Sequence, residues 1–398
     1  MGSLVSLKHV ESYQPDLVLH AMRSCLAPLG GMAAFIRPRQ RVLLKPNILG
    51  GFRPERAATT HPSVVRAAIL LAQEVGATVL VGDSPGVGSL EWAAKASGIL
   101  AVVEETGATL ADFEATQDFD QPANTVAKRL TLARAVADAD AIVSLPKLKT
   151  HAQMTFTGAI KNQYGLIPGT RKSQWHFRLQ ERKWLAALIL DVHRIALPAL
   201  AIMDAIVGME GKGPSGGRPR QIGALIAGRD FAAVDTLACA LIGIDPQSVP
   251  VLEAAQRHRI GATSLPELDV VGDDWRALRV PDFEKVSHLE DVLRLVPLPR
   301  RALDWIRDQW TARPRIVEGR CIECGVCVEA CPVELPAIQP ESLNVDEVRC
   351  IRCYCCHEFC PNQAIELAPS FLARWLDFQS LSHRVGKVLW GAKARTPK

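Results

Sequence analysis

Long apolar runs are missing from this sequence of 398 residues. A membrane-spanning helix needs about eighteen or more mostly apolar residues in a row. The best stretch, residues 184–203, is interrupted by Asp191, His193, Arg194 and Pro198. The opening residues, MGSLVSLKHV, also lack the apolar region of a signal peptide. We therefore predict a chain without a transmembrane helix and without a secretory leader.

A large excess of either charge is missing too. The net charge is +4, and residues 371–398 alone hold six basic residues against Asp377. The other 370 residues therefore carry 40 basic and 41 acidic side chains. Because a body that binds nucleic acid needs a basic face of its own, this balance predicts no DNA or RNA partner.

Cysteine is scarce outside one short region. Nine of the 11 cysteines lie between residues 321 and 360, whereas Cys25 and Cys239 stand alone. The region contains CIECGVCVEACP and CIRCYCCHEFCP, two runs with the spacing Cys-x-x-Cys-x-x-Cys-x-x-x-Cys-Pro. This doubled spacing is the bacterial ferredoxin signature, in which the last cysteine of each run binds the cluster of the other run.

The spacing predicts two 4Fe–4S clusters with crossed ligands. The first would take Cys321, Cys324, Cys327 and Cys360, and the second Cys350, Cys353, Cys356 and Cys331. Structural zinc has no use for a third close cysteine or a crossing one, and thiols packed this closely cannot pair as disulfides without strain. Cys355 falls outside the ligand spacing and is given no role. Because cluster-binding thiolates belong in a reducing compartment, we predict a cytoplasmic protein.

From residue 41 on, short apolar segments alternate with amphipathic ones. Strands are predicted at 41–47, 77–83, 109–113, 140–145, 199–207 and 222–228, and helices at 62–75, 89–98, 175–195 and 231–242. Apolar strands that alternate with helices favour a mostly parallel sheet covered on both faces. The predicted fold class is α/β, with a small α+β dicluster ferredoxin-like domain at the C-terminal end.

Composition divides the chain into four segments. They are an α/β body (1–272), a connector rich in Trp, Arg and Pro (273–315), the ferredoxin module (316–369) and a basic tail (370–398). Apolar residues at 371, 375, 378, 381, 385 and 388 predict an amphipathic helix in the tail. This helix would pack on the protein or lie on an anionic membrane surface, and both alternatives stay open.

Polar residues gather after the predicted strands, where doubly wound sheets bind their ligands. The densest group is Lys147, Lys149, His151 and Lys161, with no acidic residue between them. Lysines suit a phosphate or carboxylates, and a histidine can transfer a proton near neutral pH. We predict an anionic-substrate site with Lys147, Lys149 and His151 as its catalytic residues. The expected substrate-binding residues are Lys45, Asn47, Asp83, Ser84, Lys161, Asn162, Asp204 and Glu210.

Two nucleotide-binding motifs are absent. In GMEGKGPSGG only two residues separate Gly208 from Gly211, and Gly213 stands where a Walker A motif has Ser or Thr. The loop DSPGVG likewise lacks the Gly-x-Gly-x-x-Gly spacing. The chain is therefore expected to be neither a P-loop NTPase nor a nicotinamide-binding Rossmann protein.

Several motifs occur in the order of one known family. They are LLKPN, TTHP, VGDSPG, LPKLKTH, TGAIKN, DAIVGMEGKGP and the VD pair at Asp235, within about residues 40–245. In this order they resemble the domain of unknown function numbered 362. The run CIRCYCCHEFCP resembles the ferredoxin module that many members carry after that domain. The resemblance implies an iron–sulfur protein and leaves its reaction open.

Three functions are compatible with these features. The leading expectation is an oxidoreductase whose two clusters exchange electrons with an anionic small molecule in the body, with a ferredoxin or flavodoxin as redox partner. The alternative is a protein that passes electrons between protein partners, with membrane contact through residues 371–398. A third is a non-redox enzyme with structural clusters.

Overall fold

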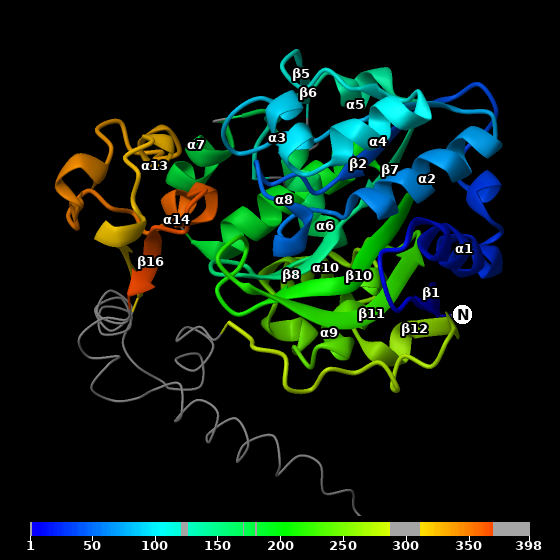
Figure 1. The fold of residues 1–398 in the computed structure, drawn as a ribbon. Coiled ribbons are helices and arrows are strands. Elements are labelled where there is room, and N and C mark those ends of the chain that lie inside the picture. The colour runs from blue at the N-terminus through cyan, green and yellow to red at the C-terminus, as the bar shows by residue number, and fades with distance from the viewer. Residues whose placement is uncertain (1, 121–125, 170, 180, 287–310, 369–398) are drawn as a thin grey trace, which may run out of the picture.

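The computed structural model describes residues 2–120, 126–169, 171–179, 181–286 and 311–368. A large α/β body and a small cysteine-rich module lie side by side (Figure 1). The predicted tail helix (371–398) and residues 287–310 of the predicted connector lie outside the described residues. Within the described ranges, no helix has both the length and the apolar character needed to cross a membrane.

The elements of the body precede those of the module along the chain. The strands of the body are β1 (Ser3–His9), β2 (Arg41–Pro46), β3 (Thr78–Val81), β4 (Thr109–Leu110), β5 (Thr116–Asp120), β6 (Arg129–Ala133), β7 (Ala141–Leu145), β8 (Lys147–His151), β9 (Thr155–Thr157), β10 (Leu200–Glu210), β11 (Arg218–Gly228) and β12 (Leu268–Gly272). Its α-helices are α1 (Pro15–Leu26), α2 (Pro62–Glu74), α3 (Leu90–Ala96), α4 (Ile99–Thr106), α5 (Ala135–Asp138), α6 (Ala159–Asn162), α7 (Arg171–Arg178), α8 (Arg182–Ala196), α9 (Phe231–Leu241) and α10 (Pro250–His258). The module contains β13 (Arg313–Ile316), α13 (Val326–Glu329), β14 (Ile338–Gln339), β15 (Asn344–Val345), α14 (Cys355–Phe359) and β16 (Ile365–Ala368).

The main sheet has the strand order β12-β1-β11-β10-β7-β2-β3-β4, with β8 and β9 attached beside β10. Strands β10, β7, β2, β3 and β4 pair in parallel, whereas β11 is antiparallel to both of its neighbours, β10 and β1. The mostly parallel sheet predicted from the apolar segments is therefore confirmed. Strand β1, which lies before the first predicted strand, was not expected from the sequence.

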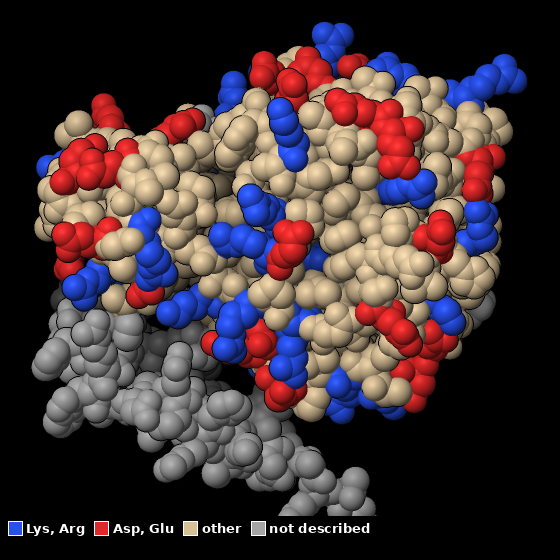
Figure 2. All heavy atoms as spheres, viewed as in Figure 1, with Lys and Arg blue, Asp and Glu red and all other residues tan. Residues whose placement is uncertain are grey.

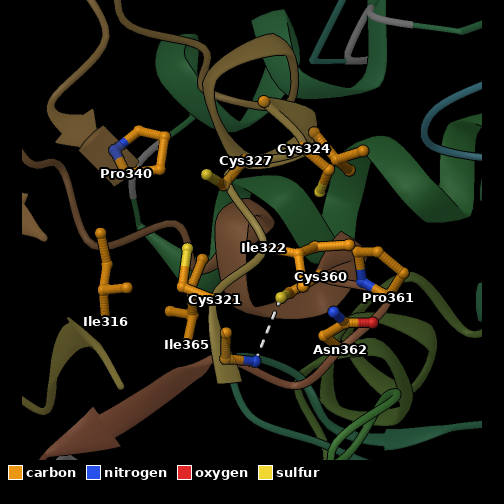
Figure 3. Close-up of a pocket in the computed structure, with 13 residues that line it drawn as sticks. Ile316, Cys321, Ile322, Cys324, Cys327, Pro340, Cys360, Pro361, Asn362 and Ile365 are labelled. Atoms are coloured by element: carbon orange, nitrogen blue, oxygen red, sulfur yellow. Dashed lines mark hydrogen bonds between the residues drawn. The ribbon is translucent and has the colours of Figure 1, made fainter. Parts of the chain in front are cut away.

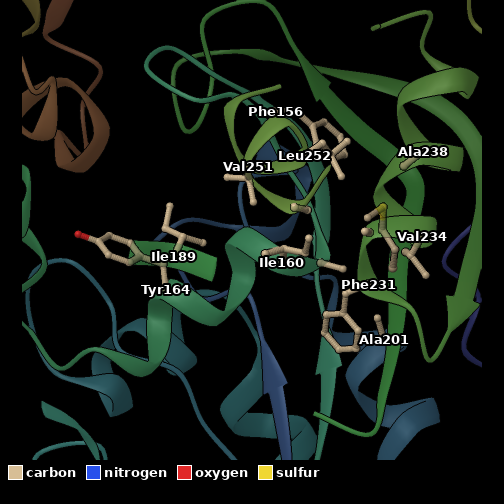
Figure 4. Packing of buried hydrophobic residues seen from close by; sticks show 14 of the residues in the cluster. Phe156, Ile160, Tyr164, Ile189, Ala201, Phe231, Val234, Ala238, Val251 and Leu252 are labelled. Atoms are coloured by element: carbon tan, nitrogen blue, oxygen red, sulfur yellow. The ribbon is translucent and has the colours of Figure 1, made fainter. Parts of the chain in front are cut away.

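Helices cover both faces of this sheet. Successive residues of a strand point to opposite faces, so Leu43 packs on one side of β2, while Val42 and Leu44 pack on the other. Helices α1, α2 and α4 cover one face, and α8, α9 and α10 cover the opposite face (Figure 1). Figure 4 shows the core between the sheet and helices α8, α9 and α10, where Phe231 of α9 lies close to Ala201 of β10.

Two predictions about local structure are wrong. The single helix expected at 175–195 is two helices, α7 and α8, and their buried sides differ. Helix α7 buries the polar Lys172 and His176, whereas the apolar side of α8 begins only at Leu185. The segment 147–151, which follows the predicted strand 140–145 and was not itself predicted as a strand, is strand β8, which pairs with β10 and β9.

Candidate active site and cluster sites

Two cavities in the module are each lined by four cysteines. The first is lined by Cys321, Cys324, Cys327 and Cys360, and the second by Cys331, Cys350, Cys353 and Cys356. Each set joins three cysteines of one run to the last cysteine of the other run. Figure 3 shows the four sulfur atoms of the first set around one space. The fold therefore brings together the two groups of ligands that the sequence spacing predicts.

The lining of the cavities suits an iron–sulfur cluster. Apolar side chains, among them Ile316 and Ile365, complete the first wall, and the backbone N–H of Ala364 donates to Cys360 Sγ over 3.2 Å (Figure 3). Hydrogen bonds to cluster sulfurs are among the features that tune such sites. The described residues contain no group of three or more His, Cys, Asp or Glu suited to a single metal ion. Cys355 is buried but lines neither cavity.

Five lysines of the body form a buried or partly buried group, which we call the lysine cluster. Its members are Lys45, Lys147, Lys149, Lys161 and Lys172. Successive side chains of a strand point to opposite faces, so Lys147, Lys149 and His151 of β8 lie on the same side. This alternation places two members of the cluster next to each other. The members lie close enough to one another for their charges to interact.

Two members of the lysine cluster are neutralised within the body. Lys45 Nζ donates to Asp83 Oδ1 over 2.7 Å and to Asn162 Oδ1 over 3.3 Å. Lys147 Nζ lies 2.8 Å from Asp204 Oδ2 and 2.8 Å from the hydroxyl of Tyr13. The two ion pairs and the hydrogen bond to Asn162 bring together five of the residues that the sequence predicted for the site, and these contacts stabilise the site.

Lys149 and Lys161 differ, because no carboxylate of the described residues lies in direct contact with either ammonium group. Within the part of the chain that the structure describes, neither forms an ion pair, and Lys149 donates only to the carbonyl of Ala58, over 2.7 Å. Burial, and then the charge of Lys161, lowers the pKa of Lys149 to about 7. Burial also lowers the pKa of Lys161. An anion placed between these two ammonium groups would replace the solvation that both have lost.

Several buried polar atoms of the body have no hydrogen-bond partner among the described residues, and two of them belong to residues beside Lys149 or beside its acceptor Ala58. Thr157 is opposite Lys149 in the β8–β9 pair, and Thr59 follows Ala58. The hydroxyl oxygens of both threonines and the amide oxygen of Asn47 are buried without a hydrogen-bond partner among the described residues. Because buried polar atoms are normally satisfied, these atoms point to a bound molecule or to ordered water.

His151 faces the cysteine-rich module. Its Nδ1 accepts hydrogen bonds from the backbone N–H groups of Gln153 and Met154, each over 3.1 Å. In the neutral ring the proton is therefore on Nε2, since Nδ1 acts as an acceptor. His151 Nε2 lies 3.9 Å from Glu358 Oε2 of α14. Glu358 is also an acid whose charge acts on Lys149, Lys161 and Lys172.

Helix α14 joins the module to the body. The hydroxyl of Ser215 donates to the carbonyl of Glu358 over 2.7 Å, and Gln363 Nε2 donates to the carbonyl of Ser215 over 3.0 Å. Gly86 leaves room for the ring of Phe359, which a β-carbon at that position would overlap. The helix that carries Cys356 therefore presents Glu358 to the lysine cluster.

The remaining predicted residues have local partners. Ser84 Oγ accepts from the backbone N–H of Gly169 over 2.7 Å, near the carbonyls that receive Lys172 Nζ. Glu210, at the end of β10, accepts from the backbone N–H of Glu284 over 3.0 Å and lies 3.5 Å from Arg218 Nη2. Both of these partners lie outside the lysine cluster.

Three residues near the cluster were not found from the sequence. Tyr13 donates to Asp204 Oδ1 over 2.7 Å. Lys172 comes from α7, and its backbone carbonyl accepts a hydrogen bond from the hydroxyl of Tyr164 over 2.9 Å. Glu358 lies inside the second cysteine run, where no spacing rule singles it out. All three come from segments outside the predicted strand ends, so only the tertiary fold reveals them.

The chain matches two family models. The domain of unknown function (DUF362) matches residues 42–240, and a 4Fe-4S dicluster domain matches residues 313–361. A thylakoid-associated protein of Synechocystis sp. is 35% identical over 288 residues, which are 69% of this chain and 88% of the relative.

Two solved structures are more distantly similar. One is the lactate racemase apoprotein from Thermoanaerobacterium thermosaccharolyticum, with 15% identity and a TM-score of 0.37 over 58% of this chain and 55% of that one. The other is a protein from Thermotoga maritima, with 16% identity and a TM-score of 0.36 over 58% of this chain and 60% of that one. The chain thus spans less than two thirds of either structure.

The two domain matches agree with the motifs and the cysteine spacing, and the Synechocystis relative is matched over most of its length. The chain therefore belongs to the family of the domain of unknown function 362 and carries a C-terminal 4Fe–4S dicluster domain.

Proposed function

We propose that the protein is an iron–sulfur oxidoreductase that exchanges electrons with an anionic small molecule bound at the lysine cluster. One observation carries the proposal: α14, which contributes Cys356 to the second cavity, also brings Glu358 to within 3.9 Å of His151. Cluster ligands and the lysine cluster therefore meet at one interface. An electron carrier without substrate chemistry would have no need for this arrangement.

The cysteines would hold two 4Fe–4S clusters, one in each cavity of the module. Such clusters supply single-electron transfer within a range of about −700 to +450 mV. A redox protein such as a ferredoxin or flavodoxin would exchange electrons with the module from outside. Cys324 and the apolar Ile322, which line the first cavity, are both exposed and would face such a partner.

The residues of the body would bind and orient the anion. Lys149 and Lys161 would place ammonium groups on it, and the hydroxyls of Thr59 and Thr157 would donate hydrogen bonds to it. His151 would hold a transferable proton at Nε2, on the side that faces Glu358. Basic side chains also gather on the surface where the body meets the module (Figure 2), which would attract an anion from solution.

A reoxidation assay tests this function. The anaerobically purified protein is reduced with dithionite, and phosphate esters and carboxylates that also carry a reducible carbonyl or C=C group are screened as electron acceptors for oxidation of the clusters. We expect one anion class to reoxidise them, and His151→Gln to slow that step while the iron content is unchanged. Oxidation by redox proteins alone would support the electron carrier instead. Clusters that dithionite cannot reduce would favour the non-redox enzyme.

Glu358 provides a second test. Its carboxylate would act as an internal counter-ion to the lysine cluster, in the place that an anionic ligand takes. We therefore expect Glu358→Gln to bind sulfate more tightly than the natural protein, by about tenfold if one competing charge is removed. Isothermal titration calorimetry at constant ionic strength measures this change. Glu366→Gln, a nearly isosteric change of an exposed acid paired with Arg320, is the matched control, and equal affinities of both variants would contradict the assignment.

We also propose that the protein associates with membranes through residues 371–398. The support is the basic composition of this segment and the name of the Synechocystis relative, which describes that protein as thylakoid-associated. Lys and Arg residues near an anionic surface each contribute about 1 kcal/mol of attraction. We expect the full chain to co-sediment with vesicles that contain anionic lipid, and a chain ending at residue 370 to stay in solution. Equal sedimentation of both chains would contradict a role of the tail.

A further inference from the structure

Arg56 reaches from the body to the first cavity of the module. It ends a short 3-10 helix, η3 (Pro54–Arg56), and its guanidinium carbon lies 5.2 Å from the centre of the Phe52 ring. Arg56 Nη2 donates to the carbonyl of Ser215 over 2.8 Å, and Nη1 to the carbonyl of Pro361 over 3.4 Å. Pro361 directly follows Cys360, and both line the first cavity. The guanidinium is thus anchored beside the crossing ligand of that cavity.

The charge of Arg56 has no carboxylate partner. Among the described residues, none forms an ion pair with it, and its side chain is only partly exposed to solvent. Burial lowers the pKa of Arg56, and the charge of Cys360 opposes that effect. Since a guanidinium stays protonated in proteins, a positive charge lies close enough to Cys360 to interact with its thiolate.

The second cavity differs in the origin of its arginine. Arg352, which lines the second cavity, belongs to the module itself. Arg56 belongs to the body, more than three hundred residues from Cys360 in the chain. The first cavity therefore receives the charge of Arg56 only when the module is docked on the body.

We infer that Arg56 is a positioning residue through which the body sets the reduction potential of the cluster in the first cavity. A cluster bound by four thiolates is negatively charged, and it gains one more negative charge when it accepts an electron. A fixed cation nearby stabilises the reduced form more than the oxidised form and so raises the reduction potential. The body thus makes the first cluster a better electron acceptor than it would be in the module alone. This inference rests on the proposed clusters but not on the proposed anion.

A redox titration followed by EPR tests the inference on the full chain. We expect Arg56→Gln to shift the midpoint potential of one cluster to a more negative value and to leave the other unchanged. Arg56→Lys, which keeps the charge, should stay near the natural potential. Ser215→Ala, which removes a neutral hydrogen bond of the same interface, should change neither potential.

Several results would overturn the role of Arg56. One is an Arg56→Gln protein with both potentials unchanged. Another is an equal shift in Ser215→Ala, which would assign the effect to packing of the interface. If Arg56→Gln fails to retain iron, an Arg56→Lys protein with a clearly lowered potential would still refute the electrostatic role. Absence of the proposed clusters would give a different result from a wrong role for Arg56, because the reduced natural protein would then show no EPR signal.

Discussion

Replacing Cys353 with alanine should remove one of two clusters and lower the iron content from about eight to about four atoms per chain. Cys353 lines the second cavity together with Cys331, Cys350 and Cys356, and none of these four cysteines lines the first cavity. With only three thiolate ligands, the second 4Fe–4S cluster would be bound less stably and would dissociate. Iron analysis and the EPR spectrum of the reduced, anaerobically isolated protein measure the change.

Cys355→Ala is the matched control for this substitution. Cys355 lies in the same run and is as buried as any cluster ligand, yet it lines neither cavity. We expect the control to keep both EPR signals and the full iron content. Equal iron loss in Cys355→Ala would show that the second run binds its cluster through other sulfurs. Zinc in place of iron in the natural protein would contradict both cluster sites.

The cysteine ligands of each cluster could be predicted because three of the four lie close together in the sequence. Ligand spacing within twelve residues fixes which three sulfurs surround one cluster, and the doubled run supplies the fourth. The main sheet could be predicted for a related reason, since apolar strands such as 41–47 and 222–228 need cover on both faces. Strand β1 was not predicted, because it pairs with β11 between residues more than two hundred positions apart in the sequence.

The polar site could be predicted only in part. Lys147, Lys149 and His151 share one side because strand β8 alternates, and their residue types already indicated an anion. Sequence could not distinguish Lys147, which Asp204 neutralises, from Lys149, which has no carboxylate partner among the described residues. That difference depends on a carboxylate fifty-seven positions away. The sequence also could not reveal the role of Glu358, because the contact of α14 with the body depends on the whole fold.

The position of Glu358 gives the two parts of the molecule a common electrostatic environment. The five lysines of the cluster face three carboxylates, those of Asp83, Asp204 and Glu358, so that positive charge is in excess when all are ionised. A cluster in the adjacent module adds negative charge when reduced. Binding of an anion and reduction of the second cluster should therefore oppose each other, and by linkage each should weaken the other equally.

Replacing Lys149 with methionine should weaken sulfate binding by about ten- to a hundredfold, because a charge-assisted hydrogen bond is worth about 1.5–3 kcal/mol. Burial lowers the pKa of Lys149 to about 7, so the free protein carries this charge below that pH and loses it above. An anion prefers the protonated form. The affinity of the natural protein should thus be highest below about pH 7 and fall as the pH rises through that value. Sulfate is a suitable probe because its own charge is constant over this range.

The pH profile separates the role of Lys149 from a general loss of positive charge. In Lys149→Met the fall near pH 7 should disappear, while a fall near pH 8 remains from Lys172, whose pKa burial lowers to about 8. Lys95→Met, which removes an exposed lysine of α3, should keep the natural affinity and profile. Calorimetry in two buffers with different ionisation enthalpies should also show proton uptake on binding near pH 7, because the anion raises the pKa of Lys149. If Lys149→Met retained both the affinity and the fall near pH 7, the anion would bind elsewhere.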